Sequence, residues 1–476
     1  GQVRQNKAMD RVHPHDLKGR KVLLMGLGSF GGGAGCARAL IQYGADLTIT
    51  DLRPESSLQS SLDSLQGLNW TGHFEGHSKA LFDWADYVVV NPAVPDDAAY
   101  LQYARARGCS LTTEINLALE LAPEVPTVAI TGTHGKSTTA ALVADLLEPL
   151  EGNTVLAGNM GGSLLEVMDG LGSRDQLVLE LSSFQLERLL APPNWPKAAL
   201  LTCLREDHLD RHLTLQAYAE AKLNLLKSQG PTDCLYLPAN EPCLQTWRNE
   251  ARGVVKTLDP STLDPTIFGL HRSELPMSEP YRASALLAAV AVAQDWNVSP
   301  IEMGPILRDF KGLPHRLQKL PSPDWLNLVD NGIATHPEPT AEALRNLSGP
   351  VFLIAGGKDK GLSLSQLVEA ASTCQSLHLF GTGGHRLANE LAARTRQRVK
   401  LHPSCQAAAE AALAELPAPA TDCTLLFSPS FSSYDEFNNF QQRASLFQKI
   451  CVTNFATTKR EPVTPAVRRA TLEPEP

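Results

Sequence analysis

The segment T-G-T-H-G-K-S-T-T at 131–139 contains the residue types that hold a phosphate, and it joins an apolar run at 127–130 to a helical pattern. Glycines let a backbone wrap closely around a phosphate, and the N-terminus of a helix offers unpaired N–H groups. Lys136 supplies a charge for the outer phosphates and Ser137 supplies a hydroxyl for Mg²⁺. The spacing predicts a short variant of the nucleotide-binding P-loop, because Ile130 stands where the usual motif has its first glycine. A plain glycine-rich turn would need neither the lysine nor the run of hydroxyls.

Two polar segments follow the next predicted strands. E-L-S-S-F-Q-L at 180–186 comes at the end of the run 176–181, and D-H-L-D-R-H at 207–212 comes after the run 198–202. Open α/β sheets present such strand ends to their ligands. We expect the strand that ends at Glu180 to lie beside the P-loop strand, where its carboxylate can hold Mg²⁺. Taken alone, each segment is also explained by a solvated charged turn.

A glycine-rich turn near the N-terminus points to another nucleotide. G-L-G-S-F-G-G-G at 26–33 lies between a predicted strand at 21–25 and a predicted helix at 34–43. A second strand at 46–50 is followed by Asp51, about twenty residues after the turn, as in the dinucleotide-binding fingerprint. A dehydrogenase is therefore one alternative, although it does not explain the P-loop.

Composition limits the class of protein. The 476 residues suggest roughly three domains. A net charge of -9 argues against non-specific nucleic-acid binding. No apolar run reaches the ~18 residues of a membrane span, and residues 1–16 do not read as a signal peptide. The nine cysteines form no C-x-x-C pair, which favours buried thiols in a reducing compartment. A cytoplasmic protein without a membrane span is the expectation.

The order of predicted elements indicates an α/β fold of three successive domains. Pro123 and Pro126 indicate a linker after the first β/α alternation, and the second alternation ends near G-L-P-H-R at 312–316. The third has strands predicted at 326–329, 351–355, 376–380 and 423–427. The predicted domains and tail are 1–125, 126–316, 317–458 and a disordered segment at 459–476.

Together these motifs resemble the Mur ligases, a family of ATP-dependent, amide-forming enzymes of peptidoglycan precursor synthesis. The P-loop variant, E-L-S-S-F-Q-L and D-H-L-D occur in the family's order, with G-N-M-G-G at 158–162 between the first two and G-L-P-H-R after them. The segments at 356–361 and 428–440 look like those of the glutamate-adding members, as does T-D-L-R at 50–53. The resemblance covers residues 18–455. It implies a Rossmann-like UDP-binding domain, a central P-loop domain of the ATPase type and a Rossmann-like C-terminal domain.

The resemblance also implies roles for single residues. The implied ATP contacts are Gly132, Thr133, Gly135, Lys136, Ser137, Thr138, Arg316 and Asn331. The implied contacts of the UDP-substrate are Gly28, Ser29, Phe30, Gly31, Asp51, Arg53, Asn159 and Ser182. The implied amino-acid contacts are His315, Lys360, Ser433 and Phe440. The implied metal-site residues are Ser137, Glu180, His208 and Lys222. The implied catalytic residues are Lys136, Glu180, His208 and Lys222.

What the family does supplies the remaining expectations. The substrates are UDP-N-acetylmuramoyl-L-alanine, glutamate and ATP, joined through an acyl-phosphate intermediate with two Mg²⁺ ions by a monomer. Lys222 matches the lysine that is carbamylated in the family, a change that turns a cation into a metal-binding anion. A lysine on an amphipathic helix is more commonly just solvated, so both possibilities stay open. The sequence also leaves open which enantiomer of glutamate is added.

Two segments depart from the family's pattern near the nucleotide. E-P-Y-R-A-S at 279–284 stands where the family has H-N-x-x-N, and D-N-G-I-A-T at 330–335 stands where it has N-D-S-[KI]-A-T. The paired asparagines and the serine hydroxyl are missing, whereas the phosphate and metal residues are intact. Two alternatives therefore remain beside the glutamate ligase. One is a relative that binds nucleotide without turnover, and the other is a sister ligase, or a folylpolyglutamate synthase-like enzyme, with a different amino acid or acceptor.

Overall fold

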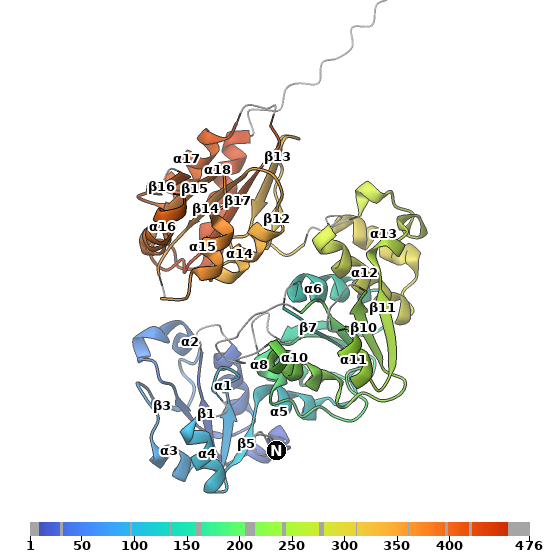
Figure 1. Cartoon of the computed structure of the whole chain (residues 1–476). Helices are drawn as coiled ribbons and strands as arrows, with labels where there is room; N and C mark the ends of the chain where they lie inside the picture. Colours follow the sequence, from blue (N-terminus) through green and yellow to red (C-terminus); the bar gives the residue numbers. More distant parts are fainter. Residues whose placement is uncertain are drawn as a thin grey trace, which may run out of the picture. The chain divides into compact units, whose positions relative to one another are not determined.

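A computed structural model of the chain describes residues 9–28, 32–95, 98–133, 135–158, 163–204, 215–239, 244–275, 280–310, 312–359, 361–395, 398–417 and 421–455. The chain divides into two compact units, Gly1–Gly312 and Leu313–Pro476. Figure 1 labels the helices and strands of both units.

The first unit begins with a five-stranded sheet of order β3-β2-β1-β4-β5, in which all neighbours are parallel. Its strands are β1 (Lys21–Met25), β2 (Asp46–Thr50), β3 (Thr71–His73), β4 (Tyr87–Val90) and β5 (Ser110–Thr112). Its helices are η1 (Pro14–Leu17), α1 (Gly32–Gln42), η2 (Glu55–Ser57), α2 (Gln59–Asp63), α3 (Lys79–Trp84), α4 (Ala99–Ala106) and α5 (Glu114–Leu121). The central strands are continuous apolar runs because a parallel sheet is buried on both faces.

The second sheet of this unit has six parallel strands in the order β11-β10-β9-β6-β8-β7. Its strands are β6 (Thr127–Thr131), β7 (Thr154–Gly158), β8 (Gln176–Glu180), β9 (Ala198–Leu201), β10 (Cys234–Pro238) and β11 (Val254–Leu258). Its α-helices are α6 (Lys136–Leu147), α7 (Leu164–Met168), α8 (Ser183–Leu186), α10 (Leu215–Leu223), α11 (Leu244–Glu250), α12 (Pro280–Asp295) and α13 (Pro300–Asp309). Its 3-10 helices are η3 (Asn224–Leu226), η4 (Pro260–Thr262), η5 (Pro265–Phe268) and η6 (Arg272–Glu274). Strand β6 pairs with β8, so the expectation that Glu180 ends a strand beside the P-loop strand is confirmed.

The second unit holds a six-stranded sheet of order β12-β13-β17-β14-β15-β16, in which only the β12–β13 pair is antiparallel among the described strands. Its strands are β12 (Gln318–Lys319), β13 (Leu326–Asp330), β14 (Val351–Gly356), β15 (Ser376–Phe380), β16 (Val399–His402) and β17 (Cys423–Ser430). Its helices are α14 (Pro337–Arg345), α15 (Ser365–Ala371), α16 (Gly381–Thr395), α17 (Cys405–Glu415) and α18 (Phe440–Phe455). Helices α14, α15 and α16 share one apolar core with the sheet, and α17 and α18 share another (Figure 1).

The predicted fold class, three successive α/β domains, agrees with these three sheets. Each sheet falls inside one of the predicted ranges 1–125, 126–316 and 317–458, although the boundaries themselves stay a prediction. The predicted tail at 459–476 lies outside the described residues. Among the helices that the structure describes, none combines the length and apolarity needed to cross a bilayer.

Candidate functional site

The P-loop is held against the end of β9 by contacts that only glycine allows. Gly132 has φ +145, and a Cβ on it would lie 1.9 Å from Thr202 Oγ1. The backbone N–H of Thr133 donates to the carbonyl of Cys203 at 2.9 Å. Gly135, with φ +77, is the residue before α6 and begins the helix in a left-handed conformation. The loop therefore leads from β6 into the N-terminus of a helix, which is the arrangement that binds phosphates.

Lys136 lies over its own loop. Its ammonium donates to the carbonyls of Gly132 at 3.0 Å and Thr133 at 2.8 Å. Ser137 is buried beside it, and Thr138 is half-buried on the next position of α6. The two carbonyls keep the cation at the loop, which fits the predicted role of holding phosphate.

Glu180 carries a buried oxygen that no described group satisfies. The residue is 2% exposed, and its Oε2 is buried without a hydrogen-bond partner among the described residues. A buried carboxylate oxygen without a donor is costly, whereas a hard cation such as Mg²⁺ prefers such a ligand. Within the described ranges no three His, Cys, Asp or Glu side chains gather to hold a metal, and the predicted ligand His208 lies outside them. Glu180 thus fits one ligand position of a metal site.

Lys222 is buried against the P-loop, which rules out the alternative of a solvated helical lysine, whereas its metal-site role stays a prediction. The residue is 1% exposed, and its Nζ donates to the carbonyl of Gly132 at 3.0 Å and to Thr131 Oγ1 at 3.3 Å. The same nitrogen lies 4.5 Å from the ring centroid of Tyr218, whose hydroxyl donates to Thr133 Oγ1 at 3.3 Å. Sequence reasoning missed Tyr218, although its spacing of one helical turn from Lys222 could have indicated it.

Ser182 has a structural partner of its own. Its Oγ accepts from the backbone N–H of Gln185 at 3.3 Å, and the Gln185 side chain accepts from the Ser182 N–H at 2.9 Å, which caps α8. Contact between Ser182 and a substrate stays a prediction.

Six of the predicted site residues lie outside the described ranges, namely Ser29, Phe30, Gly31, Asn159, His208 and Lys360.

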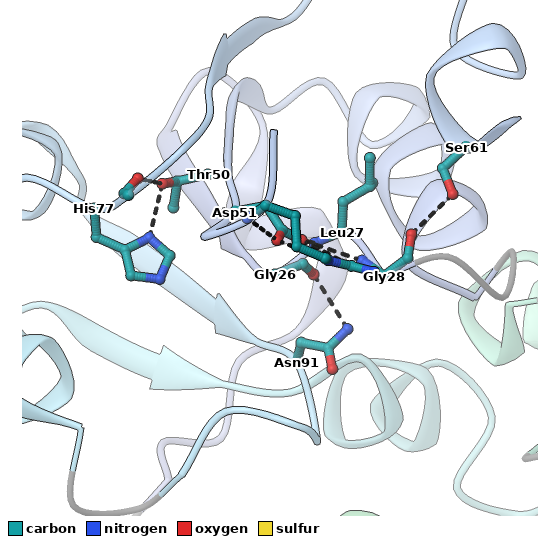
Figure 2. A network of polar contacts seen from close by, with 10 residues as sticks. Gly26, Leu27, Gly28, Thr50, Asp51, Ser61, His77 and Asn91 are labelled. Carbon is teal, nitrogen blue, oxygen red and sulfur yellow. Dashed lines mark hydrogen bonds and ion pairs between the residues drawn. The ribbon is translucent and has the colours of Figure 1, made fainter. Parts of the chain in front are cut away.

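In the first sheet, Asp51 organises the glycine turn (Figure 2). Its Oδ2 accepts from the backbone N–H groups of Leu27 at 2.9 Å and Gly28 at 3.4 Å, while Arg53 Nε donates to its Oδ1 at 3.2 Å. Burial raises the pKa of Asp51, but the hydrogen bonds from Arg53 and Leu27 outweigh it and leave the pKa below its ordinary value. The carboxylate is therefore ionised at neutral pH, and Gly28, Asp51 and Arg53 lie together, while their contact with a UDP-substrate stays a prediction.

The turn after β4 packs on that glycine turn, which sequence reasoning did not anticipate. Asn91 Nδ2 donates to the carbonyl of Gly26 at 3.1 Å, and its Oδ1 accepts from the N–H of Ala93 at 2.9 Å. Gly26 has φ +92, and a Cβ there would lie 2.9 Å from the Cβ of Asn91. The only signal in the sequence is the Asn-Pro pair that ends a buried strand.

In the second unit, two of the predicted amino-acid contacts lie together. The rings of His315 and Phe440 meet edge to face, with centroids 6.5 Å apart. His315 Nδ1 is 2.7 Å from Oδ2 of the buried Asp330, which also accepts from Gln448 Nε2 at 2.7 Å. Asp330 therefore orients the imidazole. The sequence shows only that Asp330 and Asn331 stand in the reverse of the expected order, which does not reveal this role.

Asn331 is buried inside the second unit. Its Nδ2 donates to Ser428 Oγ at 2.9 Å, and its Oδ1 accepts from the N–H of Leu317 at 3.2 Å. These bonds give Asn331 a structural role, and its contact with ATP stays a prediction, as does that of the half-buried Arg316.

A small hollow in the second unit lies where the two glutamate-type segments meet. Lys358 and Ser432 exchange backbone hydrogen bonds of 2.9 and 3.3 Å, and Ser433 follows, buried. The hollow is lined by Thr335, Pro337, Lys358, Asp359, Leu362, Ser430, Phe431 and Ser432.

A second hollow lies beside the P-loop in the first unit. It is lined by Thr139, Leu200, Leu201, Thr202, Pro238, Leu258, Ser284, Ala285 and Ala288. Ser284, from the segment 279–284, is among the lining residues.

Comparison with known proteins gives consistent matches. The model of the Mur ligase middle domain matches residues 130–264. A protein of Roseiflexus sp. (strain RS-1) is 33% identical over 467 residues, covering 91% of this chain and 98% of its own length. Another, of Geobacter metallireducens (strain ATCC 53774 / DSM 7210 / GS-15), is 34% identical over 460 residues, covering 91% and 97%. Both relatives are named UDP-N-acetylmuramoylalanine–D-glutamate ligase.

Solved structures share the fold. A UDP-N-acetylmuramate-alanine ligase of Thermotoga maritima matches with a TM-score of 0.52 and 17% identity, covering 91% of this chain and all 100% of that one. A MurF ligase of Thermotoga maritima in complex with ADP matches with a TM-score of 0.51 and 14% identity, covering 92% and 99%. At these identities the likeness concerns the fold alone.

Proposed function

This chain belongs to the Mur ligase family, and we propose that it joins D-glutamate to UDP-N-acetylmuramoyl-L-alanine with consumption of ATP. The observation that carries the proposal is 33% identity over 98% of the length of a relative named for that reaction. The intact P-loop supports it, as do the buried Glu180 and Lys222, because a phosphate-binding loop with charged groups beside it is what an ATP-dependent ligation needs.

The reaction must convert a carboxylate oxygen of the acceptor, which is a poor leaving group, into a good one. A carboxylate oxygen of the acceptor attacks the γ-phosphorus of ATP, and ADP leaves. The amine of glutamate then attacks the acyl carbon, phosphate leaves and a proton is released. No enzyme nucleophile is needed, so the protein acts by alignment and by electrostatic stabilisation.

Each part of the P-loop site has a role in this scheme. Lys136 holds the phosphates, and its position over the loop supports that role. Ser137 and Glu180 would hold Mg²⁺, and the buried Oε2 of Glu180, which has no hydrogen-bond partner among the described residues, fits an oxygen ligand. Mg²⁺ bound there, two ions by family resemblance, would screen the repulsion between carboxylate and triphosphate.

We infer further that Lys222 acts as a carbamate. The Lys222 ammonium would first lose a proton, and the resulting amine would attack CO₂ and release a second proton, so that a carbamate anion replaces a buried cation beside Thr131 and Gly132. Burial against the P-loop supports this assignment, because an anion at that position can orient a metal.

The remaining substrates are assigned to the other two sheets. Residues 1–125 would bind the UDP end, with Gly28, Asp51 and Arg53 around the glycine turn. Residues 317–458, together with His315 at the end of the central range 126–316, would bind glutamate.

The experiment is phosphate release from ATP with UDP-N-acetylmuramoyl-L-alanine and a panel of amino acids, including both enantiomers of glutamate. Release that requires acceptor and D-glutamate supports the proposal. Release with a different amino acid would identify a sister ligase. Nucleotide binding without release for any member of the panel would identify a relative without turnover.

A further inference from the structure

A buried arginine joins the two sheets of the first unit. Arg188 lies just after α8 and is 2% exposed. Its Nη2 donates to the carbonyl of Val94 at 2.7 Å, and its Nη1 donates to the carbonyl of Asn91 at 3.5 Å. Both carbonyls belong to the turn after β4 in the first sheet, whereas Arg188 follows β8 of the second sheet.

The turn that Arg188 grips is attached to the glycine turn. Asn91 Nδ2 donates to the carbonyl of Gly26 at 3.1 Å, and the two residues pack without room for a side chain on Gly26 (Figure 2). Strands β1 and β4 are neighbours at the point where the strand order of the sheet reverses, which is where such sheets bind ligands. A shift of the 91–94 turn relative to the second sheet would therefore carry the glycine turn, Gly26 and Gly28 included, with it as one piece.

The main chain beside Arg188 is also tied to the first sheet's helices. Asn116 on α5 is 2% exposed, and its Nδ2 donates to the carbonyl of Arg188 at 2.8 Å. Its Oδ1 accepts from the N–H of Leu190 at 2.8 Å. Side chain and backbone are thus both anchored, so the segment between β8 and Leu190 has little freedom to slide. Moving either carbonyl away would break a hydrogen bond to a buried guanidinium, which opposes any other arrangement.

We propose that Arg188 is a positioning residue for the acceptor. It sets the distance between the glycine turn, which takes the UDP end, and the Glu180 end of β8, which meets the carboxylate to be activated. The inference rests on the proposed function, because only an acceptor that reaches both sheets senses that distance. UDP alone reaches one sheet, so its affinity does not depend on the joint. A fixed distance between the glycine turn and the end of β8 favours binding of the long acceptor, because the protein loses little conformational freedom when the acceptor binds.

The test compares two ligands on Arg188→Gln. Calorimetry measures the Kd of UDP and of UDP-N-acetylmuramoyl-L-alanine, and initial rates give the KM of acceptor and of ATP. Loss of a buried charged donor should raise the Kd and KM of the acceptor about tenfold. The Kd of UDP and the KM of ATP should change by less than about twofold.

Arg11→Gln is the matched control. Arg11 also reaches across the two sheets, since it donates to the carbonyl of Ala191 at 2.7 Å and to Glu120 at 2.6 Å, but it makes no bond to the 91–94 turn. Its acceptor affinity should stay within about twofold of the unchanged protein.

If Arg188→Gln does not fold, Arg188→Lys tests the positioning role instead. It keeps a cation and a donor toward Val94, so the acceptor KM should rise only about threefold. Equal weakening of UDP and acceptor, or an acceptor affinity that neither variant alters, overturns the proposal. If the wild-type protein binds the acceptor more tightly than UDP but releases no phosphate, the proposed function is contradicted. The comparison of UDP and acceptor affinities in the variants would still test the positioning role. If the wild-type protein binds the acceptor no more tightly than UDP, the positioning role is contradicted.

Discussion

At the scale of single residues, the candidate site depends on polar groups that the fold buries around one loop. Lys136 and Lys222 both donate to the carbonyl of Gly132, and Tyr218 donates to Thr133. Residue types and spacing predicted the loop and the identity of its lysine. Burial of Lys222 could not be predicted, because a lone lysine in a helix carries no sign of which face packs.

Lys136→Ala should lower phosphate release by about a hundredfold or more, because it removes the charge that faces the transferring phosphoryl group. The fold should tolerate the change, since Lys136 is only half-buried and its described bonds are to two carbonyls of its own loop. Rates and thermal unfolding measured together check this. A folded variant with near-normal release would contradict the assignment of the P-loop.

Lys222→Ala should also lose activity, and a small carboxylate such as acetate should restore part of it by standing in for the carbamate. Lys222→Arg should resist rescue, because its guanidinium stays cationic. Lys227→Ala, at an exposed position shortly after the same helix, is the control and should keep full activity. Phosphate release with and without acetate makes the measurement. Full activity of Lys222→Ala without any additive would remove the carbamate from the account.

At the scale of elements, the predicted strands that coincide with the structure are the central ones. Strands β1, β2, β4 and β15 begin and end where expected, because each is a short segment whose residues are almost all buried inside a parallel sheet. The edge strands β7, β11 and β16 were not predicted, since they are half-exposed and mix polar with apolar residues. Their places come from pairing with a neighbour, which a single segment does not reveal.

The packing of α5 on α7 contains a carboxyl that should make stability depend on pH. Glu114 Oε1 accepts from Ser163 Oγ at 2.5 Å and from the N–H of Leu165 at 3.4 Å. Burial raises its pKa from 4.5 to about 7 despite these bonds, and nearby Glu166 adds to the rise. The folded state therefore keeps a proton that the unfolded chain loses.

Because the folded pKa is the higher one, the contribution of Glu114 is complete below the unfolded pKa and is lost as pH rises toward about 7. The loss is on the order of 3 kcal/mol. The glutamine of the Glu114→Gln variant does not titrate. The free energy of unfolding of this variant minus that of the wild-type protein should therefore be larger near pH 8 than near pH 5. Calorimetric unfolding at the two pH values measures this, with the exposed Glu124→Gln as control. An equal difference at both pH values would contradict the buried-carboxyl argument.

At the scale of the whole molecule, the two compact units have separate cores. The cores built from the last sheet contain only residues of Leu313–Pro476. Sequence reasoning anticipated three α/β domains, and the three sheets agree with it. It did not anticipate that the first two sheets form one unit, because the joints are long-range pairs such as Arg188 with Val94.

A fragment of residues 313–476 should therefore fold by itself. Its sheet and both flanking cores are complete, so we expect cooperative thermal unfolding with helical and strand signals in circular dichroism. The full chain should show a transition at a similar temperature. A fragment without a cooperative transition would show that the last sheet depends on the rest of the chain.

The most direct test of the central claim is mass spectrometry of the products formed from an acceptor labelled with oxygen-18 in its carboxylate. The reaction contains D-glutamate, ATP and Mg²⁺. Activation as an acyl phosphate predicts an amide product and released phosphate that carries one labelled oxygen, because the attacking carboxylate oxygen leaves with phosphorus. Unlabelled phosphate, or phosphate release without the amide product, would contradict the account.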